Sequence, residues 1–96
     1  MSQNLPIDAV VMLAAPTIAR ALSESALARA DFKEDVDWEG SDSLRLTIDY
    51  FKDREEEVTA ETLLALVQGI EQTLQAAGDE RLVHVNFAPT PRLASE

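Results

Sequence analysis

The sequence has no cysteine and only one histidine, His84. A chain without cysteine can form neither a disulfide framework nor a zinc ribbon, and it has no thiol nucleophile. A single histidine leaves little room for a histidine-based metal site or a catalytic triad, because each needs further ligands or a nucleophile. We therefore expect no metal, no cofactor and no catalytic centre, and hence a protein that is not an enzyme.

Basic residues are also few, since 8 Lys and Arg stand against 18 Asp and Glu and give a net charge of -10. Binding a phosphate backbone requires a basic surface, so we expect no nucleic-acid partner. No apolar run approaches the roughly 18 residues that a membrane span requires, so we expect no membrane association. Residues 1–6 contain no Lys or Arg, which argues against a secretory signal peptide, and we expect a cytoplasmic protein.

The remaining composition, with 46% apolar and 27% charged residues, is typical of a globular domain. A length of 96 residues allows one domain. We expect this single domain to span residues 1–96, with an ordered core at about 6–88 and an extended C-terminal tail at 89–96.

The N-terminal part, residues 6–29, is predicted as a helix because apolar residues recur at helical spacing on one face. These residues are Ile7, Val11, Ala14, Ile18 and Leu22. Pro16 lies inside this segment, and proline removes a helical hydrogen bond, so we expect a kink near residues 12–16 or two helices that meet there. The alternative is a buried strand at residues 9–13, since Val10 and Val11 are β-branched.

Two strands follow at residues 32–38 and 43–50, where apolar and polar side chains alternate. Gly40-Ser41-Asp42 between them is typical of a turn, so the pair predicts a β-hairpin. Matching the apolar faces places Trp38 opposite Leu44. The same register sets Asp37 against Arg45 and Lys33 against Asp49, which are favourable cross-strand charge pairs.

A polar connection at residues 51–58 leads to a second predicted helix at residues 60–77. Thr59 is a good N-cap for this helix, and Gly78 suits the position just after its C-terminus. Residues 82–88 alternate again, with His84 and Asn86 on the polar face, and prolines follow. The element order is therefore α-β-β-α-β.

This order predicts an α+β domain in which two helices cover one face of a three-stranded sheet, because each strand has a single apolar face. The strand order could be 1-2-3 or 2-1-3. The predicted core is Ile18, Leu22, Trp38, Leu46, Ile48, Leu63, Val67, Ile70, Leu74, Val85 and Phe87.

Three polar features could carry chemistry. Residues 35–40 imitate the start of a calcium loop, but Leu46 stands where the loop needs its bidentate Glu, so we expect a solvated hairpin end. Glu34 lies on an apolar face, and we interpret it as an inward charge that protects a sheet edge. His84 shares a polar face with Arg45 and Asp49, but no nucleophile accompanies it, which favours an exposed histidine.

The segment at residues 9–15 consists of seven consecutive apolar residues, whereas a surface helix should be polar on its outer side. Successive helical residues lie about 100° apart, so Val10, Met12 and Leu13 cannot all share the face of Ile18 and Leu22. We therefore predict that Val10, Met12 and Leu13 contribute to a partner interface. A symmetric homodimer is the commonest way to bury such a patch.

The functional hypothesis is a small acidic, non-catalytic module that binds itself or another protein, which could be basic. Bacterial or phage accessory proteins such as antitoxins, immunity proteins and secretion chaperones are of this kind. An alternative is an acidic mimic of nucleic acid that inhibits a DNA-binding protein, with Asp35, Asp37, Glu39, Asp49 and Glu55–Glu57 as phosphate-like charges. The third and weakest alternative is an enzyme subunit that uses Glu34 or His84.

Overall fold

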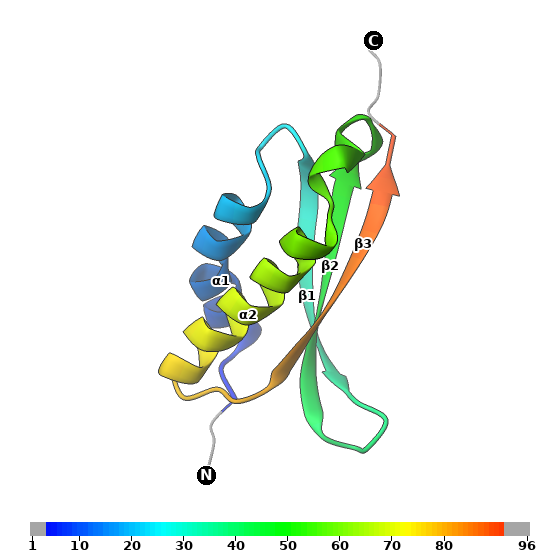
Figure 1. Cartoon of the computed structure of the whole chain (residues 1–96). Coiled ribbons are helices and arrows are strands. Elements are labelled where there is room, and N and C mark those ends of the chain that lie inside the picture. Colours follow the sequence, from blue (N-terminus) through cyan, green and yellow to red (C-terminus); the bar gives the residue numbers. More distant parts are fainter. Residues whose placement is uncertain (1–3, 92–96) are drawn as a thin grey trace.

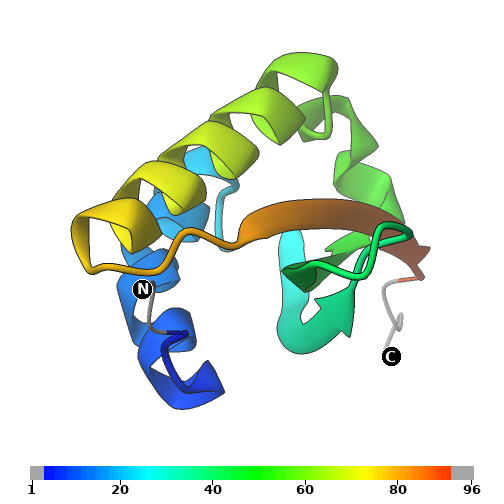
Figure 2. The same cartoon turned by 90° about the horizontal axis from the view of Figure 1, so that it is seen from below.

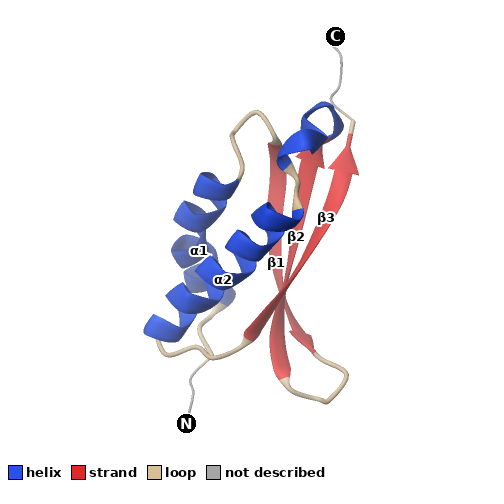
Figure 3. Ribbon diagram, in the orientation of Figure 1, coloured by secondary structure: helices blue, strands red, loops and turns tan. Residues whose placement is uncertain are grey.

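The computed structural model describes residues 4–91 and contains two α-helices, one 3-10 helix and three strands within that range. In chain order they are α1 (Ile7–Ala21), β1 (Leu27–Val36), β2 (Asp42–Phe51), η1 (Lys52–Glu57), α2 (Ala60–Ala76) and β3 (Leu82–Thr90) (Figures 1 and 3). The predicted α-β-β-α-β order and the α+β class are confirmed. β3 extends through Thr90, two residues beyond the predicted end of the ordered core, and residues 92–96 of the predicted tail lie outside the described residues.

The three strands form one sheet in the order β1-β2-β3, with β2 in the centre. β2 pairs antiparallel with β1 and parallel with β3, and α2 makes the crossover that two parallel neighbours require. Both helices lie on the same side of this sheet and pack against each other (Figures 1 and 2). No described element covers the opposite face of the sheet.

The first helix is shorter than predicted, and it is neither two helices that meet near Pro16 nor a strand at residues 9–13. It continues through Pro16 as one helix and ends at Ala21, after which Leu22 adopts an extended backbone. The alanine-rich residues that follow favour a helix by propensity, but they form β1 instead. Pairing with the whole length of β2 satisfies the backbone of β1, and this tertiary interaction overrides the local preference.

The hairpin register also differs from the prediction. Leu44 pairs with Glu34 rather than with Trp38, so the partner of each β2 residue moves by four residues along β1. Because this shift is even, every side chain keeps its face and the apolar residues still point toward the helices. On the uncovered face the shift sets Arg29 against Asp49, and it brings Lys33 opposite Arg45.

The physical reason for this register lies in the turn at residues 37–41. The Asp37 carboxylate accepts hydrogen bonds from the backbone N–H groups of Glu39 and Ser41, at 3.0 and 2.9 Å. Gly40 supplies the positive φ of +87° that closes the turn. These local bonds take Asp37 and Trp38 out of the strand, and Trp38 is 93% exposed rather than part of the core.

The core lies between the helices and the inner face of the sheet. Six of the predicted core residues are buried there: Ile18, Leu22, Leu46, Ile48, Ile70 and Leu74. Val67, Val85 and Phe87 are half-buried, whereas Leu63 is exposed and was wrongly predicted. The buried residues that the prediction missed are Val10, Ala14, Ala26, Phe32, Leu44, Leu66 and Val83.

Both ends of α2 are fixed by the residues that the sequence indicated. The Thr59 hydroxyl accepts a hydrogen bond from the backbone N–H of Thr62 at 3.1 Å. At the other end Gly78 has a φ of +94°, and the N–H of Asp79 donates to the carbonyl of Leu74. This is the Schellman arrangement, which satisfies the last carbonyls of a helix.

A buried ion pair between Asp79 and Arg81 ties the start of the described chain to the loop after α2. The two side chains meet at 2.6 Å, and Leu5 bonds to both through its backbone N–H and carbonyl. Burial acts to raise the pKa of Asp79, but the hydrogen bonds from Arg81 and from the Leu5 N–H outweigh it and lower the pKa. Asp79 is therefore held ionised and serves to anchor Leu5.

Candidate functional site

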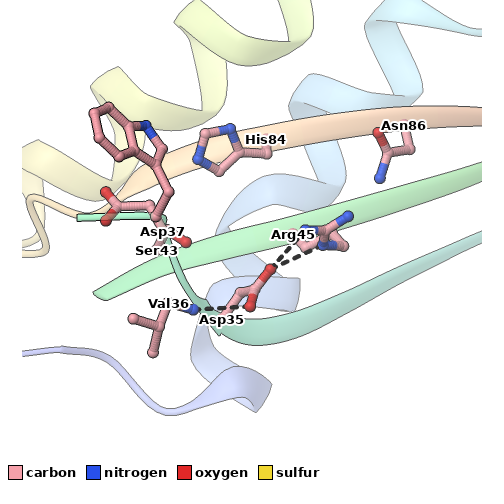
Figure 4. A pocket seen from close by; sticks show the side chains of 8 residues that line it. Asp35, Val36, Asp37, Ser43, Arg45, His84 and Asn86 are labelled. Atoms are coloured by element: carbon pink, nitrogen blue, oxygen red, sulfur yellow. Dashed lines mark hydrogen bonds and ion pairs between the residues drawn. The ribbon is translucent and has the colours of Figure 1, made fainter. Parts of the chain in front are cut away.

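The uncovered face of the sheet carries a hollow with a volume of about 320 Å³. We call it the sheet pocket. Its lining residues come from all three strands and from the hairpin turn: Asp35, Val36, Asp37, Trp38, Ser43, Arg45, His84 and Asn86. In the close-up, Asp35 lies on β1, Arg45 on β2, and His84 and Asn86 on β3 (Figure 4).

One side of the sheet pocket is an ion pair between Asp35 and Arg45. The guanidinium Nη2 and Nε approach the same carboxylate oxygen at 2.8 and 2.9 Å. The hydrogen bond from Arg45 is the main cause that lowers the pKa of Asp35, and the backbone N–H of Val36 adds to it. The cation of Arg45 is therefore already matched by a carboxylate of its own chain.

Ser43 lies near the start of the central strand β2, where it pairs with Asp35 of β1 on one side and with Leu82 of β3 on the other. It is only 1% exposed, and its hydroxyl has no hydrogen-bond partner among the described residues. A buried polar atom without a partner costs about 1–3 kcal/mol. A serine at this position is therefore unfavourable for the isolated fold, which makes it a candidate for a functional role.

The rim of the sheet pocket is formed by Asp37 and Trp38 in the hairpin turn. One carboxylate oxygen of Asp37 accepts both backbone bonds of the turn, and this holds the segment in place. Trp38 presents its indole almost entirely to solvent. This rim was not predicted, although Asp37 and Gly40 stand at the first and fourth positions that a type I turn favours.

The predicted polar face is confirmed in part, because Arg45, His84 and Asn86 do line one pocket. Glu34 is exposed, with its carboxylate 3.9 Å from the guanidinium of Arg81, so it does not sit in an apolar pocket suited to acid catalysis. Residues 35–40 form the hairpin end that we expected. Within residues 4–91 no group of three His, Cys, Asp or Glu side chains could hold a metal ion.

A second surface lies on the outer side of α1, on the other side of the molecule from the sheet pocket. Its exposed residues recur at helical spacing, and we call them the α1 surface: Asp8, Val11, Met12, Ala15, Pro16, Ala19 and Arg20. Met12 is 76% exposed. Of the predicted interface residues, Val10 is instead fully buried in its own core and Leu13 packs partly against that core.

Beside the α1 surface runs an apolar groove of about 180 Å³ between α1 and β1. Its lining residues are Val11, Ala15, Ile18, Ala19, Leu27, Ala30 and Phe32, none of which is charged. The groove exists because the outward side chains of α1 are small at Ala15 and Ala19. An exposed apolar groove next to an exposed methionine is unusual on an acidic monomer.

Comparison of the chain with protein families, with curated proteins and with solved structures yielded no match. In residues 4–91 we found no helix with the length and apolar character to cross a bilayer. Indications of function therefore come from the two surfaces themselves.

Proposed function

We propose that this protein is a non-catalytic interaction module of the cytoplasm that forms a homodimer through the α1 surface. The observation that carries the proposal is the exposed apolar stripe from Val11 to Ala19, which no described element of the chain covers. Burying apolar area stabilises an interface by about 25 cal/mol per Å² before the costs of association. Met12 remains the central interface residue, with Leu13 at its edge, whereas Val10 supports α1 from below.

The charges at the two ends of the stripe favour a second copy as the partner. Asp8 and Arg20 are the only charged residues of α1, and they flank the stripe at its beginning and end. Twelve residues of helix span about 18 Å. If the two-fold axis is perpendicular to α1, the two copies of α1 run antiparallel, and each Asp8 would then meet the Arg20 of the other copy.

Shape also favours this arrangement. In the antiparallel pairing, Met12 of one copy lies over the region of Ala15 and Ala19 of the other, beside the apolar groove. Methionine is flexible and fills irregular apolar gaps well. A copy with a net charge of -10 repels its partner, so a contact with balanced charge at its ends is the most favourable way for two copies to meet.

The first experiment is analytical ultracentrifugation of the wild type and of Met12→Glu. We expect a dimer for the wild type and a monomer for Met12→Glu, because a glutamate would bring an unpaired charge into the interface. Leu64→Glu is the matched control, since Leu64 is an exposed residue of α2 outside the α1 surface. A wild type that sediments as a monomer at high micromolar concentration would overturn the proposal.

The charge pairs allow a sharper test. Asp8→Arg and Arg20→Asp each place like charges at both ends of the antiparallel contact, so each variant alone should dimerise more weakly than the wild type. A mixture of the two variants should restore dimerisation, because every end then joins one acid and one base. Equal self-association of both single variants and the wild type would exclude the antiparallel geometry.

The acidic mimic of nucleic acid is the less well-supported function. Mimicry needs free carboxylates in rows, but Asp35 is paired with Arg45, and Glu57 accepts hydrogen bonds from Ser23. Asp49 faces Arg29 across the sheet. Because Asp35 and Glu57 are matched within the fold and Asp49 lies opposite a base, we do not propose this function.

A further inference from the structure

We propose that the sheet pocket binds the guanidinium of an arginine in a basic segment of a partner protein. The guanidinium would lie between the Trp38 indole and the Asp37 carboxylate, with the Ser43 hydroxyl as an acceptor. This inference names a partner for the interaction module described above, but it does not depend on the homodimer, because the sheet pocket and the α1 surface lie on different elements.

The charge of the sheet pocket favours a cation. Asp35 and Arg45 neutralise each other within 2.8 Å, which leaves Asp37 as the unmatched charge among the lining residues. The chain as a whole carries -10, so its field attracts basic segments and repels acidic ones. An anionic guest would have to break the Asp35–Arg45 pair to find a cation.

The rim of the sheet pocket suits a guanidinium in particular. An arginine side chain stacks on an aromatic ring and donates hydrogen bonds to a carboxylate in the same plane. Trp38 offers an exposed ring, and Asp37 offers the carboxylate in the adjacent position of the same turn. The two backbone bonds to Asp37 hold this turn in place before any guest arrives, which lowers the entropic cost of binding.

Ser43 provides an independent indication of a guest. Its hydroxyl is buried beneath the sheet pocket and lacks a hydrogen-bond partner among the described residues, although Asp35 and Arg45 lie next to it. An N–H donor of the guest that enters between the side chains of Asp35 and Arg45 would give the Ser43 hydroxyl the hydrogen bond that the isolated fold does not provide. The fold tolerates an unsatisfied serine where alanine would fit, which is expected of a residue kept for binding.

The experiment uses the full chain and the fluorescence of Trp38, which is the only tryptophan of the protein. The probe is a short synthetic peptide that alternates glycine with arginine and contains no aromatic residue. We expect a saturable change in Trp38 emission, weaker binding as salt is added, and no response to a peptide with glutamate in place of arginine. The lysine peptide should bind more weakly than the arginine peptide.

Asp37→Asn is the decisive variant, because an asparagine oxygen can still accept the two backbone bonds of the turn while the charge is lost. We expect the dissociation constant for the arginine peptide to rise roughly tenfold or more. Glu39→Gln is the matched control, since Glu39 belongs to the same turn and is exposed but does not line the sheet pocket. Equal weakening by both variants would show attraction to net charge alone and overturn the proposed site.

Ser43→Ala separates binding from stability. We expect the dissociation constant for the peptide to rise about threefold to tenfold, while the thermal midpoint stays equal or increases because an unpaired hydroxyl is removed. Unchanged binding in this variant would refute the role of Ser43. The Met12→Glu variant should bind the peptide like the wild type, so a failure of the dimer and a failure of the sheet pocket are distinguishable.

Discussion

Gly69 lies where α2 crosses α1, and its replacement by alanine tests how closely the two helices approach. A Cβ at this position would lie 2.8 Å from the Cγ2 methyl of Thr17, well inside the about 3.5–4.0 Å of a favourable carbon contact. Thr17 is buried and β-branched, so its methyl cannot swing aside easily. The glycine of α2 is therefore explained by a side chain of α1.

Two opposing effects determine the magnitude. Alanine favours a helix interior over glycine by about 1 kcal/mol, whereas overpacking a well-packed contact costs about 1–3 kcal/mol. We therefore expect Gly69→Ala to lower the free energy of unfolding by about 1 kcal/mol. For a domain of this size such a loss lowers the thermal midpoint by about 4–8 °C.

The matched background is Thr17→Ser, which removes the methyl and keeps the hydroxyl. The Thr17 Oγ1 is 3.7 Å from the Cβ position, which is an ordinary contact. In this background Gly69→Ala should therefore stabilise the fold by about 0.5–1 kcal/mol, through helix propensity alone.

The assay is urea denaturation at one fixed protein concentration, followed by far-ultraviolet circular dichroism. Trp38 is nearly fully exposed in the folded state, so its fluorescence would report unfolding poorly. A change of sign between the two backgrounds supports the close approach of the helices. An identical effect of Gly69→Ala in both backgrounds would mean that Thr17 and residue 69 do not touch, and the explanation of Gly69 would be wrong.

Two further predictions follow from the ends of α2. Asp79→Asn should destabilise the fold by about 3 kcal/mol at neutral pH, because it removes the carboxylate at 2.6 Å from the buried guanidinium of Arg81 and leaves only the exposed Glu34 at 3.9 Å. The folded-state pKa of Asp79 lies below its ordinary value of 3.8, so its contribution to the free energy of unfolding is present above that value and is lost as the pH falls through the folded-state pKa. The difference in free energy of unfolding between the wild type and Asp79→Asn should therefore narrow below about pH 4. A difference that stays constant with pH would refute the ion pair. Thr59→Ala should cost about 1 kcal/mol in the same assay, since it removes the bond to the N–H of Thr62, whereas Thr59→Ser should preserve most of the stability.

The sequence by itself determined the local features of this protein. The alternation of apolar and polar residues over 43–50 predicted which side chains of β2 face the helices. The same alternation in the last strand placed His84 and Asn86 with Arg45 on the uncovered side of the sheet. Thr59 and Gly78 marked the ends of α2, because caps depend on residues within one turn of the helix. Such features are local, so they can be recognised without knowing the rest of the fold.

The sheet pocket could be predicted only in part. The alternation of side chains along each strand predicts which strand residues line the sheet pocket, but the position of its rim depends on the hairpin register. Matching the apolar residues of the two strands placed Trp38 inside the core. The Asp37 turn bonds compete with that matching and determine the register, which moves Trp38 into solvent. The unpartnered hydroxyl of Ser43 could not be recognised either, because it depends on which atoms surround it.

Tertiary structure alone decided the strand order, the end of α1 and the residues that α1 exposes. Ala28 and Ala30 favour a helix by propensity, but pairing along β2 satisfies more backbone groups and places them in β1. A seven-residue apolar run cannot show which of its members face inward; packing against the sheet and α2 buried Val10 and left Met12 exposed. Each of these outcomes depends on contacts between segments distant in the chain, whose free energies exceed the local preferences that a sequence displays.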